Sequence, residues 1–195
     1  MSGHVEGTRP RLLEATVEIL LERGWGGVST RVVAERAAVR PGLVHYHFGS
    51  IDDLRREAAI TTLRAVVEPF IEMAQVLAPV EVMDAIADAS VDEFAPGTPV
   101  TNLLYEVLPV TVRDRELQEA LADVLGRFRV LFAASIRRHH PHALVDPEIL
   151  AELVAATIDG LQLHLLADPG LDLRTHLHAL LPLLGPAATT PEAGR

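Results

Sequence analysis

The sequence contains no cysteine, which excludes a disulfide framework and any metal site built from thiolates. It also contains no uninterrupted apolar run long enough to cross a membrane. The first residues, MSGHVEGTRPR, lack the apolar core of a secretory signal. These absences predict a cytoplasmic protein without a membrane partner, and nothing in the composition indicates a cofactor.

Lysine is absent too, so all 17 basic residues are arginines. The chain has 27 Asp and Glu residues, which gives a net charge of −10. The charge is uneven: residues 1–64 carry +1 and residues 65–195 carry −11. Phosphate contacts are local, so the near-neutral N-terminal part can bind DNA if its arginines share one face. The arginines considered for that face are Arg9, Arg11, Arg31, Arg40, Arg55 and Arg56.

Motifs of common enzyme classes are missing. The sequence has no Gly-x-Ser-x-Gly elbow, no phosphate-binding glycine loop and no His-Glu-x-x-His. Its histidines do not converge as zinc would require: His139, His140 and His142 crowd one helix end, and His176 and His178 lie on different helix faces. We therefore expect neither an enzyme nor a metal site. The alternative to a DNA-binding protein is a helical dimeric enzyme or a scaffold that does not bind DNA.

Apolar residues recur with helical spacing along the whole chain, and no strand pattern of any length is present. The sequence therefore predicts an all-α fold. The expected helices beyond residue 40 span about 41–48, 50–76, 79–94, 101–110, 114–140, 147–167 and 172–184.

Residues 29–54, STRVVAERAAVRPGLVHYHFGSIDDL, carry the most specific signal. Ser29 or Thr30 can cap a first short helix through its hydroxyl. Pro41 disfavours helical geometry at Arg40 but suits the first turn of a second helix. Together with an amphipathic helix at residues 8–23, this pattern predicts a three-helix, helix-turn-helix head whose second short helix can enter the DNA major groove.

This segment resembles the signature of the TetR family of bacterial repressors. The matching residues are Thr30, Ala34, Ala37, Val39, Gly42, His47, Phe48, Ser50 and Leu54. Ala38 stands where the family has a turn glycine, His45 replaces a tyrosine with Tyr46 one place on, and Ile51 replaces a lysine. The tyrosine and the lysine often touch phosphate in the family.

The resemblance implies a DNA-binding domain at residues 1–50 and an effector-binding and dimerisation domain at 51–185, with a loose tail at 186–195. A long helix would join the two domains rigidly. The implied function is a sequence-specific transcriptional regulator, usually a repressor that a small-molecule effector releases from its double-stranded operator.

Three sets of candidate site residues follow. The DNA-binding candidates are Thr30, Arg31, Arg40, Pro41, Gly42, Leu43, His45, Tyr46, His47 and Ser50. The effector-binding candidates are Met83, Phe94, Asn102, Tyr105, Glu106, Phe128, Phe132 and Asp159. The residues expected to form a homodimer interface between the last two helices and their symmetry mates are Leu153, Thr157, Gly160, Leu161, Leu177 and Leu181.

Overall fold

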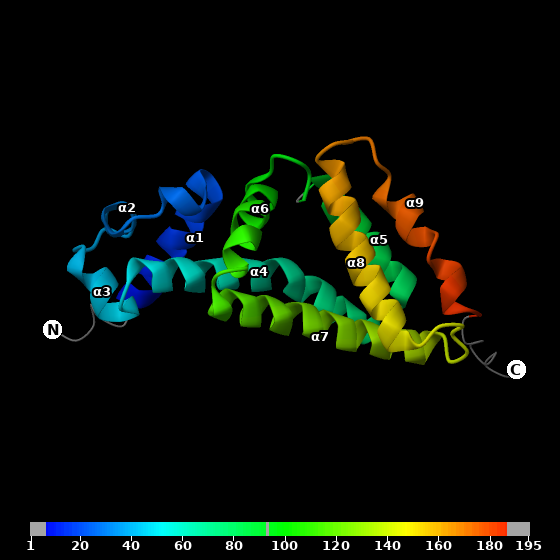
Figure 1. Ribbon diagram of the computed structural model, residues 1–195. Helices are drawn as coiled ribbons and strands as arrows, with labels where there is room; N and C mark the ends of the chain where they lie inside the picture. Colours follow the sequence, from blue (N-terminus) through cyan, green and yellow to red (C-terminus); the bar gives the residue numbers. More distant parts are fainter. Residues whose placement is uncertain (1–6, 93, 187–195) are drawn as a thin grey trace, which may run out of the picture. The chain divides into compact units, whose positions relative to one another are not determined.

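The computed structural model describes residues 7–92 and 94–186, and within these ranges the chain is helical with no strand (Figure 1). The predicted all-α fold is confirmed. The α-helices are α1 (Thr8–Gly27), α2 (Thr30–Arg36), α3 (Gly42–Phe48), α4 (Ile51–Val76), α5 (Pro79–Asp92), α6 (Pro99–Thr111), α7 (Arg115–His139), α8 (Pro147–Leu165) and α9 (Leu173–His178). A short 3-10 helix, η1 (Leu181–Leu184), follows α9.

The helices form two compact units. The N-terminal unit comprises Met1–Val66 and Gly97–Ala122, and the C-terminal unit comprises Val67–Pro96 and Asp123–Arg195. The packing of the backbone thus groups α6 and the first turns of α7 with the helix-turn-helix. The functional division at residue 50 remains a prediction. The expected tail lies outside the described residues except for Pro186.

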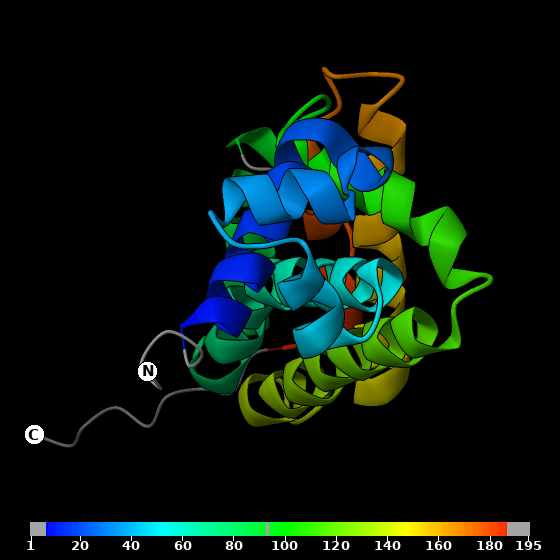
Figure 2. The ribbon, with the colours of Figure 1, turned by 90° about the vertical axis from the view of Figure 1, so that its left-hand side faces the viewer.

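In the N-terminal unit, α1, α2 and α3 pack around one apolar core (Figures 1 and 2). Leu12 and Ile19 of α1 meet Val33 of α2 and Val44 of α3, and all four are fully buried. Their burial removes apolar surface from water and fixes the angle between the two short helices. The core extends to Leu103 of α6 and Leu117 of α7.

A carboxylate of α6 holds the kinked end of α1. Gly24 leaves helical geometry with φ +69°, and the Glu106 carboxylate accepts a hydrogen bond from the Trp25 N–H at 2.5 Å. A Cβ on Gly24 would lie within about 2.3 Å of that carboxylate. Glycine is therefore required at this position for two reasons, the positive φ and the close approach of the Glu106 carboxylate.

The turn between α2 and α3 is closed by a residue in the left-handed region. Ala38 has φ +52°, and the N–H of Val39 donates to the carbonyl of Ala34 at 2.9 Å. This is the Schellman arrangement, in which the left-handed position is usually glycine. The departure from the family glycine therefore leaves local strain in the turn of the helix-turn-helix.

Ala38→Gly is expected to stabilise the protein by about 0.5–1 kcal/mol, because relief of the left-handed strain exceeds the added freedom of the unfolded chain. The matched control is Ala37→Gly, since Ala37 has helical φ −74° and is buried. That change should cost about 1 kcal/mol. Urea unfolding of both variants measures whether each change raises or lowers the free energy of unfolding. Equal destabilisation by the two changes would contradict the strain argument.

In the C-terminal unit, α9 packs against α5 and α8 (Figure 1). The core holds the stacked rings of Phe128 and Phe132, whose centroids are 5.4 Å apart. At the rim of α5 and α9, Arg174 bridges the carboxylates of Asp84 and Asp88. His178 Nε2 also lies 2.7 Å from Asp84.

The prediction of one continuous helix over residues 172–184 was wrong. The α-helix α9 ends at His178, and the 3-10 helix η1 begins at Leu181. Pro182 explains the break, because it has no N–H to donate to the carbonyl four residues earlier and it disfavours helical geometry at Leu181.

Candidate DNA-binding surface and apolar pocket

The two helices of the helix-turn-helix begin and end as their sequence predicts. The Ser29 hydroxyl accepts a hydrogen bond from Val32 N–H and caps α2. Pro41 stands at the N-cap position of α3 with φ −54°. Gly49 ends α3 with φ +79°, which glycine adopts readily.

The helix α3 presents a polar and aromatic face to solvent. Val44 is buried beneath it, and Tyr46 is 74% exposed. Of the ten DNA-binding candidates, those that are exposed are Arg31, Arg40, Pro41, Gly42, His45 and Tyr46. Those that are half-buried are Thr30, Leu43, His47 and Ser50. None of the ten belongs to the fully buried core.

Two exposed arginines of the helix-turn-helix, one on α2 and one just before α3, have side chains available to an anion. Of the nine arginines in residues 1–64, only Arg31 and Arg40 have side chains that make no hydrogen bond or ion pair with another residue in the described ranges. Both side chains are exposed. A cation already engaged by a carboxylate contributes less to phosphate binding, so the available positive charge of the head is concentrated at these two positions.

The other arginines proposed for the DNA face hold the unit together instead. Arg9 pairs with Glu57 at 2.7 Å and lies over the Phe48 ring, 4.6 Å from its centroid. Further partners bind the remaining three: Arg11 donates to the Ala37 carbonyl, Arg55 pairs with Asp52, and Arg56 pairs with Asp53 and Asp114. Carboxylates thus compensate the positive charge of Arg9, Arg55 and Arg56, whereas Arg11 keeps its charge and is held by a backbone carbonyl.

The two histidines of α3 differ in what they can reach. His45 is exposed and its Nδ1 lies 3.1 Å from the Gly49 carbonyl. The Nε2 atom of His47 is shielded from solvent and has no hydrogen-bond partner among the described residues. In this conformation that atom cannot reach a phosphate, so of the two DNA-binding candidates His45 is better suited to a phosphate contact.

Ser50 joins α3 to α4 through a cap. Its hydroxyl accepts from the Asp53 N–H at 3.0 Å and donates to the Asp53 carboxylate at 2.6 Å. This hydroxyl and then the Arg56 guanidinium hold the pKa of Asp53 below its ordinary value. Two side chains at the start of α4 are thereby fixed next to the end of α3.

Ser50→Ala is expected to cost about 1 kcal/mol of stability at neutral pH, because it removes a helix cap. A depressed carboxyl pKa contributes stability that is present above the unfolded value near 3.9 and is lost as pH falls through the folded value. The difference between wild type and variant should therefore shrink below about pH 4. Urea titrations at pH 7 and pH 3 measure it.

Ser90→Ala is the control for that experiment. The Ser90 hydroxyl donates to the Ile86 carbonyl inside α5 and has no acidic partner among the described residues. Its effect on stability should be the same at both pH values. A Ser50→Ala cost that stays constant between pH 7 and pH 3 would disprove the coupling to Asp53.

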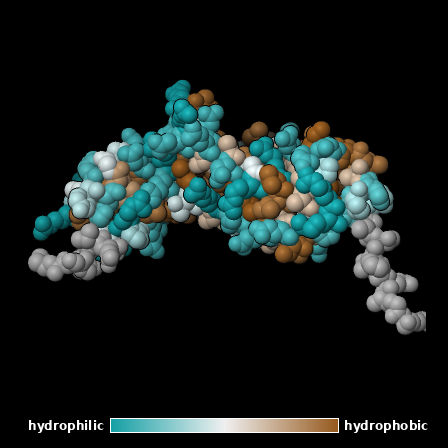
Figure 3. Space-filling model, turned by 90° about the horizontal axis from the view of Figure 1, so that it is seen from below, coloured by the Kyte–Doolittle hydropathy of each residue, from teal (hydrophilic) through white to brown (hydrophobic). Residues whose placement is uncertain are grey.

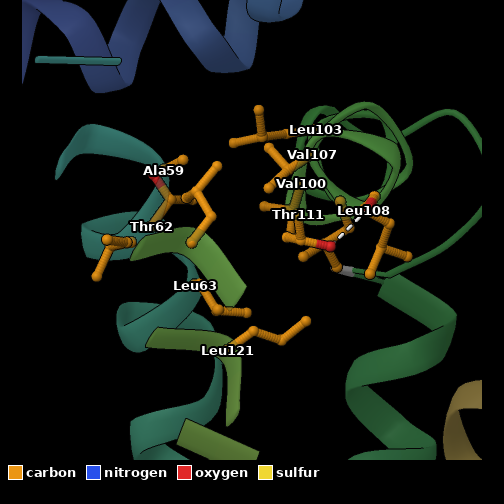
Figure 4. A pocket seen from close by; sticks show the side chains of 12 residues that line it. Ala59, Thr62, Leu63, Val100, Leu103, Val107, Leu108, Thr111 and Leu121 are labelled. Carbon is orange, nitrogen blue, oxygen red and sulfur yellow. Dashed lines mark hydrogen bonds between the residues drawn. The ribbon is translucent and has the colours of Figure 1, made fainter. Parts of the chain in front are cut away.

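A pocket opens within the N-terminal unit between α4, α6 and the start of α7 (Figure 4). Its walls bound a space of about 440 Å³, part of which is open to solvent. Side chains of α4 and α6 face one another across it, and Leu121 closes one end. The lining residues are Ala59, Ile60, Thr62, Leu63, Val100, Leu103, Leu104, Val107, Leu108, Thr111, Leu117 and Leu121.

The eight effector-binding candidates lie elsewhere, and none of them lines this pocket. Asn102, Tyr105 and Glu106 belong to the N-terminal unit, where Asn102 donates to the Gly97 carbonyl and Glu106 holds the end of α1. The five in the C-terminal unit are Met83, Phe94, Phe128, Phe132 and Asp159. All of these five are buried except Asp159, which is exposed on α8.

Exposed apolar side chains interrupt the hydrophilic surface in places (Figure 3), and α8 carries a stripe of them. Ile149, Leu153 and Leu163 are about half exposed and fall on one side of the helix at 100° per residue. Gly160 lies on the same side, and a Cβ there would meet nothing within 4 Å. An uncovered apolar stripe with a small residue at its centre suits close approach of another helix.

The dimerisation candidates fall into two groups. Leu153 is exposed, and Thr157, Gly160, Leu161 and Leu181 are half-buried. Leu177 is fully buried in the core of its own unit. It has no surface left for a second chain, so its assignment to the interface was wrong.

No group of three or more His, Cys, Asp or Glu side chains that could hold a metal ion occurs among the described residues. His139 Nδ1 and His140 Nδ1 lie within hydrogen-bond distance of the backbone carbonyls of Ser135 and Gly185 instead. In the same part of the chain, no helix is long and apolar enough to cross a membrane.

Two family models match the chain. The model of bacterial regulatory proteins of the tetR family matches residues 12–58, which span α1 to the start of α4. The model of the C-terminal part of BetI-type transcriptional repressors matches residues 79–184, more than half of the chain. The first match thus covers the helix-turn-helix, and the second runs from α5 to η1.

Individual proteins agree with these matches. A helix-turn-helix transcriptional regulator of Mycobacterium bovis is 31% identical over 160 residues, which cover 80% of each chain. A crystal structure of a transcriptional regulator from Streptomyces coelicolor A3(2) superposes with a TM-score of 0.72 at 28% identity, covering 91% of this chain and 98% of the other. A regulator from Saccharomonospora viridis, crystallised with choline, gives a TM-score of 0.71 at 21% identity over 94% and 100% of the two chains.

Proposed function

Because this chain belongs to the TetR family of bacterial transcriptional regulators, we propose that it is a repressor that a small-molecule effector releases from its operator. The observation that carries the DNA-binding part is the exposed face of α2 and α3. There, the side chains of Arg31 and Arg40 have no partner among the residues that the structure describes, and Tyr46 projects into solvent. The match to a repressor family over residues 79–184 favours repression as the sign of control.

In the proposed complex, the α3 helices of two subunits enter successive major grooves of the operator. Helix-turn-helix dimers read half-sites one helical turn apart in this way. Arg40, or Arg31 at the start of α2, is suited to hydrogen-bond guanine, and Leu43 is suited to touch a thymine methyl group. Tyr46, His45 and the backbone at Gly42 would position the helix through the phosphates.

The dimer required by this geometry would form through α8. The exposed stripe of Ile149, Leu153 and Leu163 supplies an apolar surface, and Gly160 permits close approach. A two-fold interface buries the same patch on both subunits, so a single stripe is sufficient.

The effector would act by binding one arrangement of the dimer better than the other. A ligand shifts such an equilibrium only by its difference in affinity for the two states. The choline complex of the Saccharomonospora viridis relative supports the view that a protein of this fold binds small molecules. As a repressor of chromosomal genes, the protein would work in the cytoplasm.

The matched proteins are transcriptional regulators and not enzymes, which removes the enzyme alternative. Selection of bound DNA from a random pool, followed by gel-shift titration of the selected sequence, tests the proposal. We expect a two-fold symmetric sequence bound at least ~1,000-fold more tightly than random DNA. Recovery of sequences with no common motif, or equal binding to all DNA, would refute sequence-specific regulation.

A further inference from the structure

The turn between α2 and α3 leaves one carbonyl that the turn itself does not satisfy. The N–H groups of Ala38 and Val39 donate to the carbonyls of Glu35 and Ala34, which end α2. Among the described residues, no backbone N–H donates to the carbonyl of Ala37, the last residue before the left-handed position. A free carbonyl at a helix end needs a partner from elsewhere in the chain or from water.

Arg11 of α1 supplies that partner. Its Nη2 donates to the Ala37 carbonyl at 2.5 Å across a separation of 26 residues. The neighbouring Leu12 and Ala15 are buried in the core that also contains Ala37, so α1 is packed against this turn. A guanidinium at a helix C-terminus is favourable for two reasons, because it bonds a free carbonyl and lies at the negative end of the helix dipole.

The bond from Arg11 acts on the peptide group whose rotation would relieve the strain at Ala38. The Ala37 carbonyl and the Ala38 N–H belong to one planar peptide group. An alanine at φ +52° is strained, and rotation of this peptide group would return the φ of Ala38 to negative values. The rotation would also turn the Ala37 carbonyl away from Arg11 and break the hydrogen bond from Ala38 to Glu35.

We infer that Arg11 is a positioning residue for DNA binding, which locks the Ala37–Ala38 peptide group and thereby sets the direction in which α3 leaves the turn. The effect on operator affinity rests on the proposed function, whereas the lock on the turn does not. Arg11 would thus serve DNA binding through the backbone of the turn, and not through a contact of its own charge with DNA.

The lock matters because α3 has few other constraints. The helix has seven residues, and Val44 is the one buried side chain among them. Groups that read bases must be held within about 0.5 Å and 10–20° of their productive geometry. Phosphate contacts carry no sequence information directly. Rotation of the turn peptide group should therefore lower affinity for an operator more than affinity for random DNA.

The first test needs no DNA and measures amide hydrogen exchange in the full-length wild type, Arg11→Ala, Ala38→Gly and the double variant. Arg11→Ala should lower the protection of the Ala38 N–H by about 10-fold or more, because a charge-assisted hydrogen bond no longer opposes the rotation. In the Ala38→Gly background, the same change should lower protection at position 38 by less than about 3-fold, because glycine adopts positive φ without strain. Equal protection in wild type and Arg11→Ala would overturn the lock.

Arg23→Ala is the matched control. Arg23 is also an exposed arginine of α1, but it lies 3.9 Å from Glu22 of the same helix and does not bond the turn. Its replacement should leave the protection of the Ala38 N–H unchanged. Because Arg11 is exposed as well and alanine favours helices, both variants should remain folded. A loss of protection at Ala38 that is as large in Arg23→Ala as in Arg11→Ala would refute a specific role of Arg11.

Gel shifts with the selected operator and with a random-sequence duplex separate positioning from a phosphate contact. We expect Arg11→Ala to weaken operator binding by about 10-fold, to weaken binding of the random duplex less, and to lose most of its effect in the Ala38→Gly background. Equal losses on both duplexes, undiminished by Ala38→Gly and with a shallower salt dependence, would identify a phosphate contact and refute the positioning role. If no operator is selected, the proposed function fails, while hydrogen exchange still decides whether Arg11 locks the turn.

Discussion

Replacement of Arg31 and Arg40 together by alanine is expected to weaken operator binding by about 2–6 kcal/mol, roughly 30-fold or more at moderate salt. These are the arginines of residues 1–64 that lack an intramolecular partner in the described part of the chain. Each occurs twice in a dimer, and no neighbouring lysine can substitute for them because the chain contains none. Titration of labelled operator in gel-shift or anisotropy experiments measures the loss.

The single variants distinguish base contacts from phosphate contacts. If Arg40 reads a base, Arg40→Ala should cost about 1–3 kcal/mol and relax the preference at one operator position. If it meets phosphate, the loss should be equal on all sequences and the salt dependence should become shallower by about one ion per contact. Arg115→Ala is the control, since Arg115 is exposed but pairs with Glu119 on α7. An operator affinity unchanged in the double variant would remove both arginines from the DNA-binding surface.

The helix-turn-helix could be predicted from sequence because its determinants are local. The Ser29 cap, the break at Pro41 and the burial of Val44 each depend on residues within a few positions of one another. Caps, proline and helical spacing act over one or two turns, so their effects can be predicted from a single sequence. The same logic placed the beginnings of α5 and α8 at their prolines.

The partners of the arginines and the walls of the pocket could not be predicted, because they depend on tertiary contacts. The sequence around Arg56 gives no sign that its partner is Asp114, which is 58 residues away. This ion pair makes Arg56 unsuitable for the DNA contact that was considered for it. The pocket likewise joins residues 59–63 to residues 100–121. Polar residues in apolar helices drew attention to Asn102 and Glu106, but both are engaged in hydrogen bonds within their own unit.

Periodicity also cannot tell an apolar face that packs within the chain from one that packs against a second chain. Leu153 and Leu177 look equivalent in sequence, since both repeat with leucines at helical spacing. In the structure one is 46% exposed and the other fully buried. The difference arises because α9 packs against α5 and α8, which only the assembled unit reveals.

Leu153→Asp is therefore expected to separate the proposed dimer, raising its dissociation constant by roughly 30- to 1,000-fold, about 2–4 kcal/mol. Leu153 belongs to the exposed stripe of α8, and a two-fold axis would bring the two introduced carboxylates into one desolvated interface. Because the side chain is solvent-exposed in the single chain, helix content should change little. Analytical ultracentrifugation over a concentration series measures the dissociation constant.

The same variant should lose operator affinity at concentrations where it is monomeric, because one head contacts only one half-site. Val130→Asp places the same charge on an exposed valine of a different helix, α7, and should remain dimeric and bind the operator normally. A Leu153→Asp protein that still sediments as a dimer would exclude this stripe as the interface. A monomeric variant with full operator affinity would instead show that the dimer is not needed to bind the two half-sites. Dimerisation through α8 would then have no effect on DNA binding.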